Sequence, residues 1–318
     1  MATSVPSSRD DAPDVTVLLA TFNGVRWLPE QLASILSQTG VRLRIIALDD
    51  ESDDGTRDWL VEQAAAEPRL TVLPPRGRSG GAAPNFFRLL SSVVDDIPAD
   101  GYVAFADQDD IWHDGKLERH VRMLREGGHD GVSSSVTAFS ADGGTALVRK
   151  DFPQRRFDYL TESPGPGCTF VITPRLARLV VDELADPDSV ARDAEFHDSL
   201  IYAVARARGW SWRIDGVPSV DYRQHGQNVL GSNTGVGSAV ARLKLIREHW
   251  HRNEAILHAK VAIRLAEGER QDELRRMLVL FQSRGLRGRL QLAPRARYMR
   301  RRRRDQWIIG LLIAVGIW

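Results

Sequence analysis

The fold is decided by residues 102–110, which read YVAFADQDD. An apolar run of strand length ends there in three carboxylates. Two earlier segments have the same plan, since residues 15–24 read VTVLLATFNG and residues 44–50 read RIIALDD. In open α/β sheets, ligands bind beyond the carboxyl ends of the strands. The sequence therefore predicts an α/β protein with a ligand site at one edge of its sheet.

Strands and helices alternate over the first part of the chain. Segments with helical spacing begin near Leu28, Thr56 and Asn85 and separate the apolar runs. The predicted strands are residues 15–20, 44–48, 70–73 and 102–106. This order predicts a mostly parallel, Rossmann-like sheet with helices on both faces.

The rest of the chain has a mixed pattern followed by a helical one. The predicted strands are residues 132–139, 169–173 and 210–222, and the predicted helices are residues 174–184 and 198–208. Helical spacing continues from residue 238 to residue 284. We therefore expect a disordered N-terminus (1–14), a catalytic α/β domain (15–232), a C-terminal helical extension (233–294) and a basic and apolar tail (295–318).

Composition excludes several classes of protein. The 318 residues include 43 basic and 42 acidic side chains, so a net charge of +1 does not indicate a nucleic-acid-binding protein. The one cysteine, Cys168, excludes an internal disulfide framework and a cysteine zinc cluster. The first 14 residues lack the apolar core of a signal peptide, so we expect a cytoplasmic protein.

The carboxylates after residue 106 can hold a metal ion. Magnesium and manganese prefer oxygen ligands, and magnesium is often held by one or two carboxylates together with substrate phosphates. A bound cation neutralises the charge of a departing diphosphate. An acidic turn that faces solvent and caps the next helix is the alternative interpretation of Asp107 to Asp110.

Several motifs together resemble a known family. Thr-Phe-Asn at 21–23, Asp-Asp-Glu-Ser-Asp-Asp-Gly-Thr at 49–56 and Asp-Gln-Asp-Asp at 107–110 occur in this order, and His197-Asp198 opens a later helix. This set resembles family 2 of the inverting glycosyltransferases, which have the GT-A fold. The resemblance spans residues 15 to 230. Residues 222–228, which read YRQHGQN, resemble the rhamnosyltransferase-type branch of that family.

The resemblance implies a set of residues that bind a nucleotide sugar. Asp50 would accept a hydrogen bond from the pyrimidine N–H, which suits a carboxylate because it only accepts when ionised. A turn and helix-capping pair is the alternative interpretation of Asp49 and Asp50. The implied nucleotide-sugar residues are Ala20, Thr21, Phe22, Asn23, Asp50, Asn85, Asp107 and Gln108.

The resemblance also implies a metal site. Asp109 would be the principal ligand of Mg²⁺ or Mn²⁺, His225 would be a further ligand, and Arg223 would contact the diphosphate. Asp110 would support the loop. Lys116 would either hold these carboxylates or face solvent.

An inverting transfer needs one general base beside the acceptor hydroxyl. The resemblance places this base at Asp198, and Glu195 is the second candidate. An aspartate before an apolar helical run is also a common helix N-cap, so that interpretation of Asp198 stays open.

The expected reaction is the transfer of one sugar to a glycan or lipid-linked acceptor of the cell envelope. The resemblance favours rhamnose, from a deoxythymidine- or uridine-diphosphate donor. The Gln-x-x-Arg-Trp signature of processive members is missing from the sequence, which favours single addition. A sugar nucleotidyltransferase and a non-catalytic nucleotide-binding scaffold are the alternatives, and homo-oligomerisation is left open.

The C-terminal tail combines charge with apolar residues. Arg300 to Arg304 form an uninterrupted basic run, and residues 307–318 are almost entirely apolar. This run is shorter than the ~20 residues needed to span a bilayer. A basic cluster beside such a segment suits an interfacial anchor on anionic lipid. We expect peripheral attachment to the inner face of the cell membrane, and packing against protein is the alternative.

Overall fold

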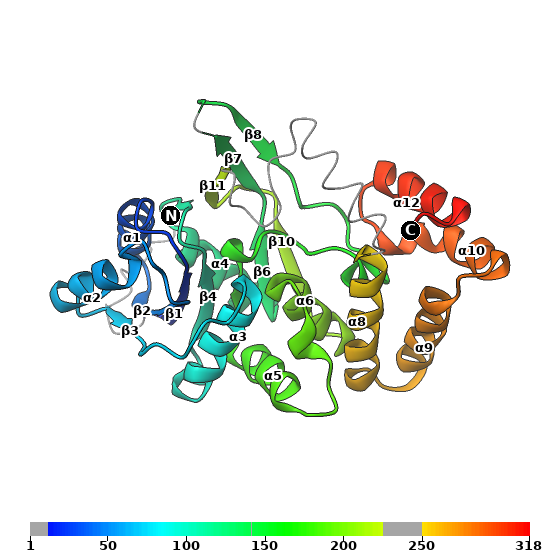
Figure 1. Ribbon diagram of the computed structural model, residues 1–318, viewed down its shortest axis with the longest axis horizontal. Helices are drawn as coiled ribbons and strands as arrows, with labels where there is room; N and C mark the ends of the chain where they lie inside the picture. Colours follow the sequence, from blue (N-terminus) through cyan, green and yellow to red (C-terminus); the bar gives the residue numbers. More distant parts are fainter. Residues whose placement is uncertain (1–11, 141, 225–249) are drawn as a thin grey trace, which may run out of the picture.

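The computed structural model describes residues 12–140, 142–224 and 250–318. Among these residues, the larger of two sheets has the strand order β10-β6-β9-β4-β1-β2-β3 (Figure 1). Its strands are β1 (Asp14–Thr21), β2 (Arg42–Asp49), β3 (Leu70–Val72), β4 (Tyr102–Ala106), β6 (Gly131–Ser134), β9 (Val171–Ile172) and β10 (Trp212–Asp215). The four strands predicted in the first part of the chain are confirmed as β1 to β4.

Strand β1 is the point at which the strand order turns back. It pairs in parallel with β2 on one side, where Thr21 lies opposite Asp49, and with β4 on the other, where Leu19 lies opposite Ala106. The carboxyl ends of the three strands therefore meet at one edge of the sheet. This reversal is the position at which open α/β sheets bind ligands.

The second sheet lies beside the first and has the order β5-β11-β7-β8. Its strands are β5 (Ile111–Trp112), β7 (Val136–Ser140), β8 (Thr145–Val148) and β11 (Val220–Gln224). Two segments that we predicted as single strands each contribute to both sheets. Residues 132–139 divide at Ser135, and residues 210–222 divide at the turn before Pro218, where proline cannot donate a ladder hydrogen bond.

Helices cover both faces of the larger sheet. They are α1 (Leu28–Leu36), α2 (Thr56–Ala66), α3 (Ala82–Val93), α4 (Lys116–Gly127), α5 (Pro174–Ala185) and α6 (His197–Ala207). Successive residues of a strand point to opposite faces. Leu18 and Ile46 accordingly belong to the core with α3, α5 and α6, whereas Val17 and Ile45 belong to the core with α1, α2 and α4.

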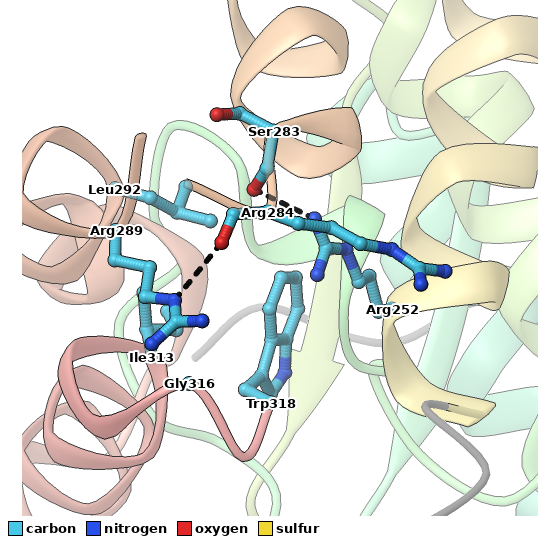
Figure 2. A pocket seen from close by; sticks show the side chains of 8 residues that line it. All are labelled: Arg252, Ser283, Arg284, Arg289, Leu292, Ile313, Gly316 and Trp318. Atoms are coloured by element: carbon cyan, nitrogen blue, oxygen red, sulfur yellow. Dashed lines mark hydrogen bonds between the residues drawn. The ribbon is translucent and has the colours of Figure 1, made fainter. Parts of the chain in front are cut away.

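The C-terminal helices form one end of the molecule (Figure 1). They are α8 (Trp250–Leu265), α9 (Gly268–Gln282), α10 (Leu286–Leu292), α11 (Ala296–Met299) and α12 (Arg303–Val315). Figure 2 shows Trp318 beside a small hollow where Arg252 donates to Ser283 O (2.8 Å) and Arg289 donates to Arg284 O (3.2 Å). Within the described ranges, no helix combines the length and the apolar character that crossing a membrane requires.

Some expectations fall on other parts of the chain. Most of the N-terminus expected to be disordered (1–14) and the domain limit expected at residue 232 lie outside the described residues. Asp14 already belongs to β1. The helical spacing predicted for residues 238–284 is confirmed over α8 and α9.

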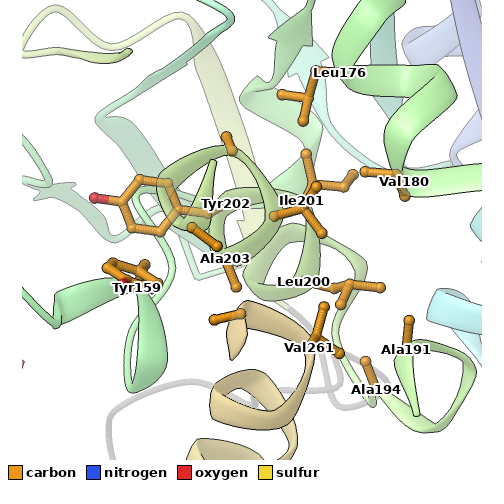
Figure 3. Close-up of a cluster of buried hydrophobic side chains, with 14 of the residues drawn as sticks. Tyr159, Leu176, Val180, Ala191, Ala194, Leu200, Ile201, Tyr202, Ala203 and Val261 are labelled. Atoms are coloured by element: carbon orange, nitrogen blue, oxygen red, sulfur yellow. The ribbon is translucent and has the colours of Figure 1, made fainter. Parts of the chain in front are cut away.

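Helix α6 is the centre of the larger hydrophobic core. Leu200, Ile201, Tyr202 and Ala203 are all at most 1% exposed, so the helix is apolar on every side (Figure 3). A helix of this kind is stable only when other elements surround it. The surrounding side chains include Leu176 and Val180 of α5, Val261 of α8, and Tyr159. The first turn of α6, which carries Asp198, is thereby fixed in the interior.

His197 joins this helix to the sheet. Its ring lies 4.1 Å from that of Phe86 in α3 and 5.7 Å from that of Phe105 in β4, measured between centroids. A Cβ on Gly167 would come within 2.1 Å of His197 Nε2, so the loop can approach only as glycine. Burial lowers the pKa of His197 to about 3.

We expect His197→Leu to change how stability depends on pH. The folded pKa is depressed from 6.5, so the neutral imidazole stabilises the fold fully above pH 6.5 and progressively less as pH falls toward 3. As pH falls through that window, the free energy of unfolding of the wild type should decrease by about 1.4 kcal/mol per pH unit relative to that of the variant. Urea unfolding at several pH values measures this difference, and parallel curves would contradict it.

Candidate active site

The end of β1 is tied to the loop that follows β4. The backbone N of Phe22 donates to Gln108 Oε1 (2.6 Å), and Gln108 Nε2 donates back to Phe22 O (2.7 Å). A Cβ on Gly24 would lie 2.3 Å from the same Oε1 atom, so the close approach favours glycine. The Phe22 ring is 36% exposed, and Arg78 Cζ lies 4.3 Å from its centroid. Predicted residues that are 86 positions apart are thus in direct contact.

Asp49 and Asp50 have different surroundings. Asp49 accepts hydrogen bonds from Thr21 Oγ1 (3.0 Å), Ser52 N (2.9 Å) and Ser52 Oγ (2.6 Å). Asp50 Oδ1 accepts from Ser79 N, in the segment before α3. Asp49 therefore holds the loop after β2 to the end of β1, which agrees with the turn interpretation.

Asn23 and Asn85 brace the same edge of the sheet. Asn23 has a φ of 50°, a left-handed conformation that asparagine tolerates better than most residues. Its N donates to Ser52 Oγ (2.8 Å), and its Oδ1 accepts from Asp53 N (3.0 Å). Asn85 is buried and donates to Leu48 O (3.2 Å) from α3. Ala20, from the predicted set, is buried below them in β1.

Three carboxylates from distant parts of the chain act on one another. Burial, followed by the charges of Asp109 and Asp198, raises the pKa of Asp107 to about 7. Asp107 is half-buried, and Asp109 is only 9% exposed. The loop after β4 and the first turn of α6 therefore present their acidic groups to a common region.

Asp110 faces inward from this loop. It is fully buried, and its Oδ1 accepts a hydrogen bond from Arg223 N (3.1 Å). Burial, followed by the charges of Asp109 and Asp107, raises the pKa of Asp110 well above its ordinary value. The Asp110 side chain is thus buried and bonded to β11, which agrees with the loop-supporting role expected from the sequence.

Lys116 lies behind the carboxylates and does not face solvent. It is 1% exposed, and its Nζ is 3.3 Å from the centroid of the Trp112 ring. Burial lowers the pKa of Lys116 to about 7, against the opposing effect of Cys168 and Asp110. Burial also raises the pKa of Cys168, so that residue is a protonated, packed thiol. Of the two alternatives that the sequence left open for Lys116, exposure to solvent is wrong.

Arg223 holds the loop after β4 against α1. Its Nε donates to Asp109 O (2.8 Å), its Nη2 contacts Glu30, and its Cζ lies 4.5 Å from the centroid of the Phe139 ring. This side chain therefore positions Asp109. His225, the other predicted ligand in the same segment, lies outside the described residues.

Asp198 lies within the first turn of α6 and is not its N-cap. The N-cap position belongs to Phe196, and Asp198 accepts a hydrogen bond from the N of Ser199 (2.6 Å). Burial raises the pKa of Asp198, whereas hydrogen bonding from Ser163 and the charge of Lys150 oppose that rise. The capping interpretation is therefore wrong. The sequence did not predict that Ser163 or Lys150 lies near Asp198.

Glu195, the second candidate base, faces another element. It is exposed, and its Oε2 accepts a hydrogen bond from Trp250 Nε1 (2.5 Å) at the start of α8. Asp198, in contrast, is among the charges that act on Asp107. The geometry therefore distinguishes the two carboxylates.

The acidic region suits a hard divalent cation. Oxygen atoms of Asp107 and Asp110 and the Cys168 sulfur lie within 4.8 Å of one another. Asp110 Oδ2 is buried and makes no hydrogen bond in the described part of the chain. Because the Cys168 thiol is protonated, carboxylate oxygens are the available donors, as Mg²⁺ and Mn²⁺ prefer.

Comparison with protein families identifies the chain. The model for glycosyl transferase family 2 matches residues 16–178. This chain belongs to glycosyl transferase family 2. The matched range contains the β1, β2 and β4 strand ends and all the carboxylates of the loop after β4. The chain is therefore a glycosyltransferase, and the sugar nucleotidyltransferase and non-catalytic scaffold interpretations are wrong.

Relatives of this glycosyltransferase agree with that assignment. It is 37% identical to the dTDP-rhamnosyl transferase RfbG of Shigella flexneri over 78% of this chain and 85% of that protein. It is 28% identical to a putative teichuronic acid biosynthesis glycosyltransferase, TuaG of Bacillus subtilis, over 48% of this chain and 54% of that protein. The crystal structure of S. aureus TarS with UDP-GlcNAc is similar at a TM-score of 0.57 and 17% identity, over 96% of this chain and 81% of that one. The predicted GT-A fold is confirmed.

Substituting Asp49 should reduce the stability of this glycosyltransferase. Asp49→Ala leaves three buried or half-buried donors without an acceptor, so we expect a loss of about 1–3 kcal/mol in the free energy of unfolding. Asp50→Ala removes one such bond and is the matched control, with a smaller expected loss. Chemical denaturation measures both, and equal losses would contradict the division of roles.

Proposed function

We propose that this chain is an inverting, metal-dependent glycosyltransferase that transfers one rhamnosyl group from a nucleoside-diphosphate donor. The acceptor is a hydroxyl of a cell-envelope glycan or of a lipid-linked saccharide. The observation that carries the proposal is the family 2 match over residues 16–178, together with the parallel pairing that brings the carboxyl ends of β1, β2 and β4 to one edge of the sheet.

The chemical step is a single in-line displacement. The Asp198 carboxylate takes the proton of the acceptor hydroxyl, and the oxygen forms a bond to the anomeric carbon. The bond from that carbon to the diphosphate oxygen breaks, and the electron pair leaves with the nucleoside diphosphate. Attack opposite the leaving group inverts the anomeric centre. Because burial raises the pKa of Asp198, the carboxylate is a stronger base than an exposed aspartate.

The loop after β4 would hold the cation. Asp109 and Asp107 are the proposed ligands because Asp107 is half-buried and Asp109 keeps 9% exposure, whereas Asp110 is fully buried and accepts a hydrogen bond from Arg223 N. A bound Mg²⁺ or Mn²⁺ supplies neutralisation of the diphosphate charge. Arg223 fixes the loop through Asp109 O, so its proposed role is to position this site.

The donor is held at the ends of β1 and β2. Phe22 is exposed beside Arg78, which gives an aromatic face for a pyrimidine ring. Asp50 is proposed to accept the pyrimidine N–H. The similarity to a dTDP-rhamnosyl transferase supports deoxythymidine diphosphate and rhamnose.

A lipid-linked acceptor has separate support. The chain is 23% identical over 51% of its length to WfgD of Escherichia coli, whose name describes glucosyl transfer to α-D-GlcNAc-diphosphoundecaprenol. The match covers 60% of that protein. We propose that the enzyme works at the inner face of the cell membrane, where an acceptor of this chemical class is held.

Asp198→Asn should abolish transfer but not donor binding. Removing a general base lowers the rate by about 10²–10⁴-fold, whereas the diphosphate contacts are unchanged. Initial rates with dTDP-rhamnose and calorimetric titration with dTDP measure the two effects. Glu195→Gln is the control and should retain activity. If Glu195→Gln is inactive and Asp198→Asn remains active, Glu195 and not Asp198 is the general base.

Asp109→Ala should remove the effect of metal on nucleotide binding. The wild type should show a larger thermal stabilisation by dTDP with Mn²⁺ than with a chelator, because the cation links the carboxylates to the diphosphate. Asp114→Ala, an exposed aspartate four residues after Asp110, is the control and should behave as wild type. A metal-dependent shift that survives in Asp109→Ala would refute the assignment.

A further inference from the structure

A basic hollow lies where the C-terminal arginine run meets the catalytic domain. It has a volume of about 430 Å³ and is lined by Phe152, Pro153, Arg155 and the run Arg301–Arg304. The residues therefore come from two segments that are about 150 positions apart. The sequence predicted the arginine run as part of an interfacial anchor, and in the structure residues 152–155 of the catalytic domain lie on the other side of the hollow.

Arg301 is built into the interior of this hollow. It is 3% exposed, and its backbone N donates to Glu162 Oε1 (2.6 Å). Its Nε and Nη1 atoms lie 3.3 Å from Glu162 and 3.8 Å from Asp158, and neither makes a hydrogen bond among the described residues. These two carboxylates balance the charge of Arg301, so this side chain fixes the wall of the hollow and the neighbouring arginines supply its excess positive charge.

The hollow has an excess of positive charge. Arg304 is paired with Asp305 (3.2 Å), but Arg155, Arg302 and Arg303 have no carboxylate within ion-pair distance in the described chain. Arg155 Nε is buried and likewise makes no hydrogen bond there. Clustered arginine donors of this kind match phosphate oxygens in geometry and charge.

The hollow adjoins the catalytic base. Arg301 Nη2 donates to Ser163 O, and Arg301 Cζ lies 6.0 Å from the centroid of the Tyr202 ring, one helical turn after Asp198 in α6. Lys150, directly before the Asp151–Phe152 segment, lies in the electrostatic field of both Arg301 and Asp198. A group bound by the arginines is therefore next to the side on which the acceptor must approach.

An apolar helix face continues from the basic hollow. Trp307, Leu311 and Val315 of α12 follow the arginines at intervals of four residues and are 81%, 65% and 53% exposed. Residues four apart lie on the same face of a helix. Arginines beside an exposed aromatic and aliphatic face fit a lipid–water interface, where phosphates lie next to acyl chains.

The other basic hollow does not have these properties. The hollow in Figure 2 has a volume of about 90 Å³. Arg252 and Arg289 use their donors there on the carbonyls that end α9 and begin the following turn. That hollow therefore has less space and fewer available donors.

We propose that the hollow lined by Arg155 and Arg301–Arg304 binds the phosphate groups of a membrane-lipid-linked acceptor. The apolar face of α12 lies against the bilayer at the same time, which directs the sugar end of the acceptor toward Asp198. This inference rests on the proposed function, because it specifies the acceptor of the same site.

The test uses the full chain with Arg302 and Arg303 both changed to alanine. These residues are exposed and lie outside the donor and base sites. Sedimentation with phosphatidylcholine vesicles that contain a polyprenyl diphosphate should show at least about tenfold weaker binding than wild type, as expected for two basic groups at an anionic surface. Arg275→Ala/Arg276→Ala, on exposed positions of α9, is the charge-matched control and should bind as wild type.

Three outcomes would overturn the inference. They are equal vesicle binding by the hollow variant and wild type, an equal loss in the control, and binding of soluble inorganic diphosphate without binding of vesicles. Calorimetric titration of the same proteins with dTDP, without vesicles, tests the proposed function separately. If the hollow variant binds dTDP as wild type does but does not bind the vesicles, the lipid site is supported. If the wild type itself does not bind dTDP, the proposed donor site is contradicted.

Discussion

Repulsion between buried carboxylates is the constraint on which the site depends. Asp107, Asp109 and Asp110 lie on one short loop, and the charge of Asp198 reaches the same loop from α6. Burial raises the pKa values of Asp107, Asp110 and Asp198, and a bound cation would relieve the repulsion between the charged carboxylates. The fold must therefore hold the loop rigidly against a force that tends to open it.

Side chains from several elements hold the loop after β4 in place. Gln108 locks it to the end of β1, Arg223 locks it to α1 and β11, and Lys116 lies beneath it. On the opposite side, α6 is buried on all its faces, so the backbone at Asp198 cannot shift away. The catalytic geometry is thus a product of hydrophobic packing as much as of polar contacts.

The sequence predicted the individual strands and the position of the site better than it predicted the tertiary contacts between segments. Alternation and length located β1, β2 and β4 because each strand is a continuous apolar run, and the motif set located the site at their ends. The division of residues 132–139 between two sheets was missed, because β-branched and small residues suit both sheets. The sequence left open whether Lys116 is buried, and it did not indicate that Arg301 donates to Ser163 O, since neither position has a local pattern that reveals tertiary burial.

The C-terminal tail is the clearest case in which tertiary structure changes the interpretation. A basic run followed by an apolar segment suggested a separable anchor, yet Arg301, Met299, Ile313 and Trp318 are buried in the described structure. Arg301 also donates to Ser163 O and lies beside the ring of Tyr202, one helical turn after Asp198 in α6. Removing residues 295–318 would therefore expose core and loosen the acceptor side together. Only the outward residues of α12 and the unpaired arginines can be changed without that consequence, so the proposed surface attachment and the proposed catalytic roles are separable by point substitution and not by truncation.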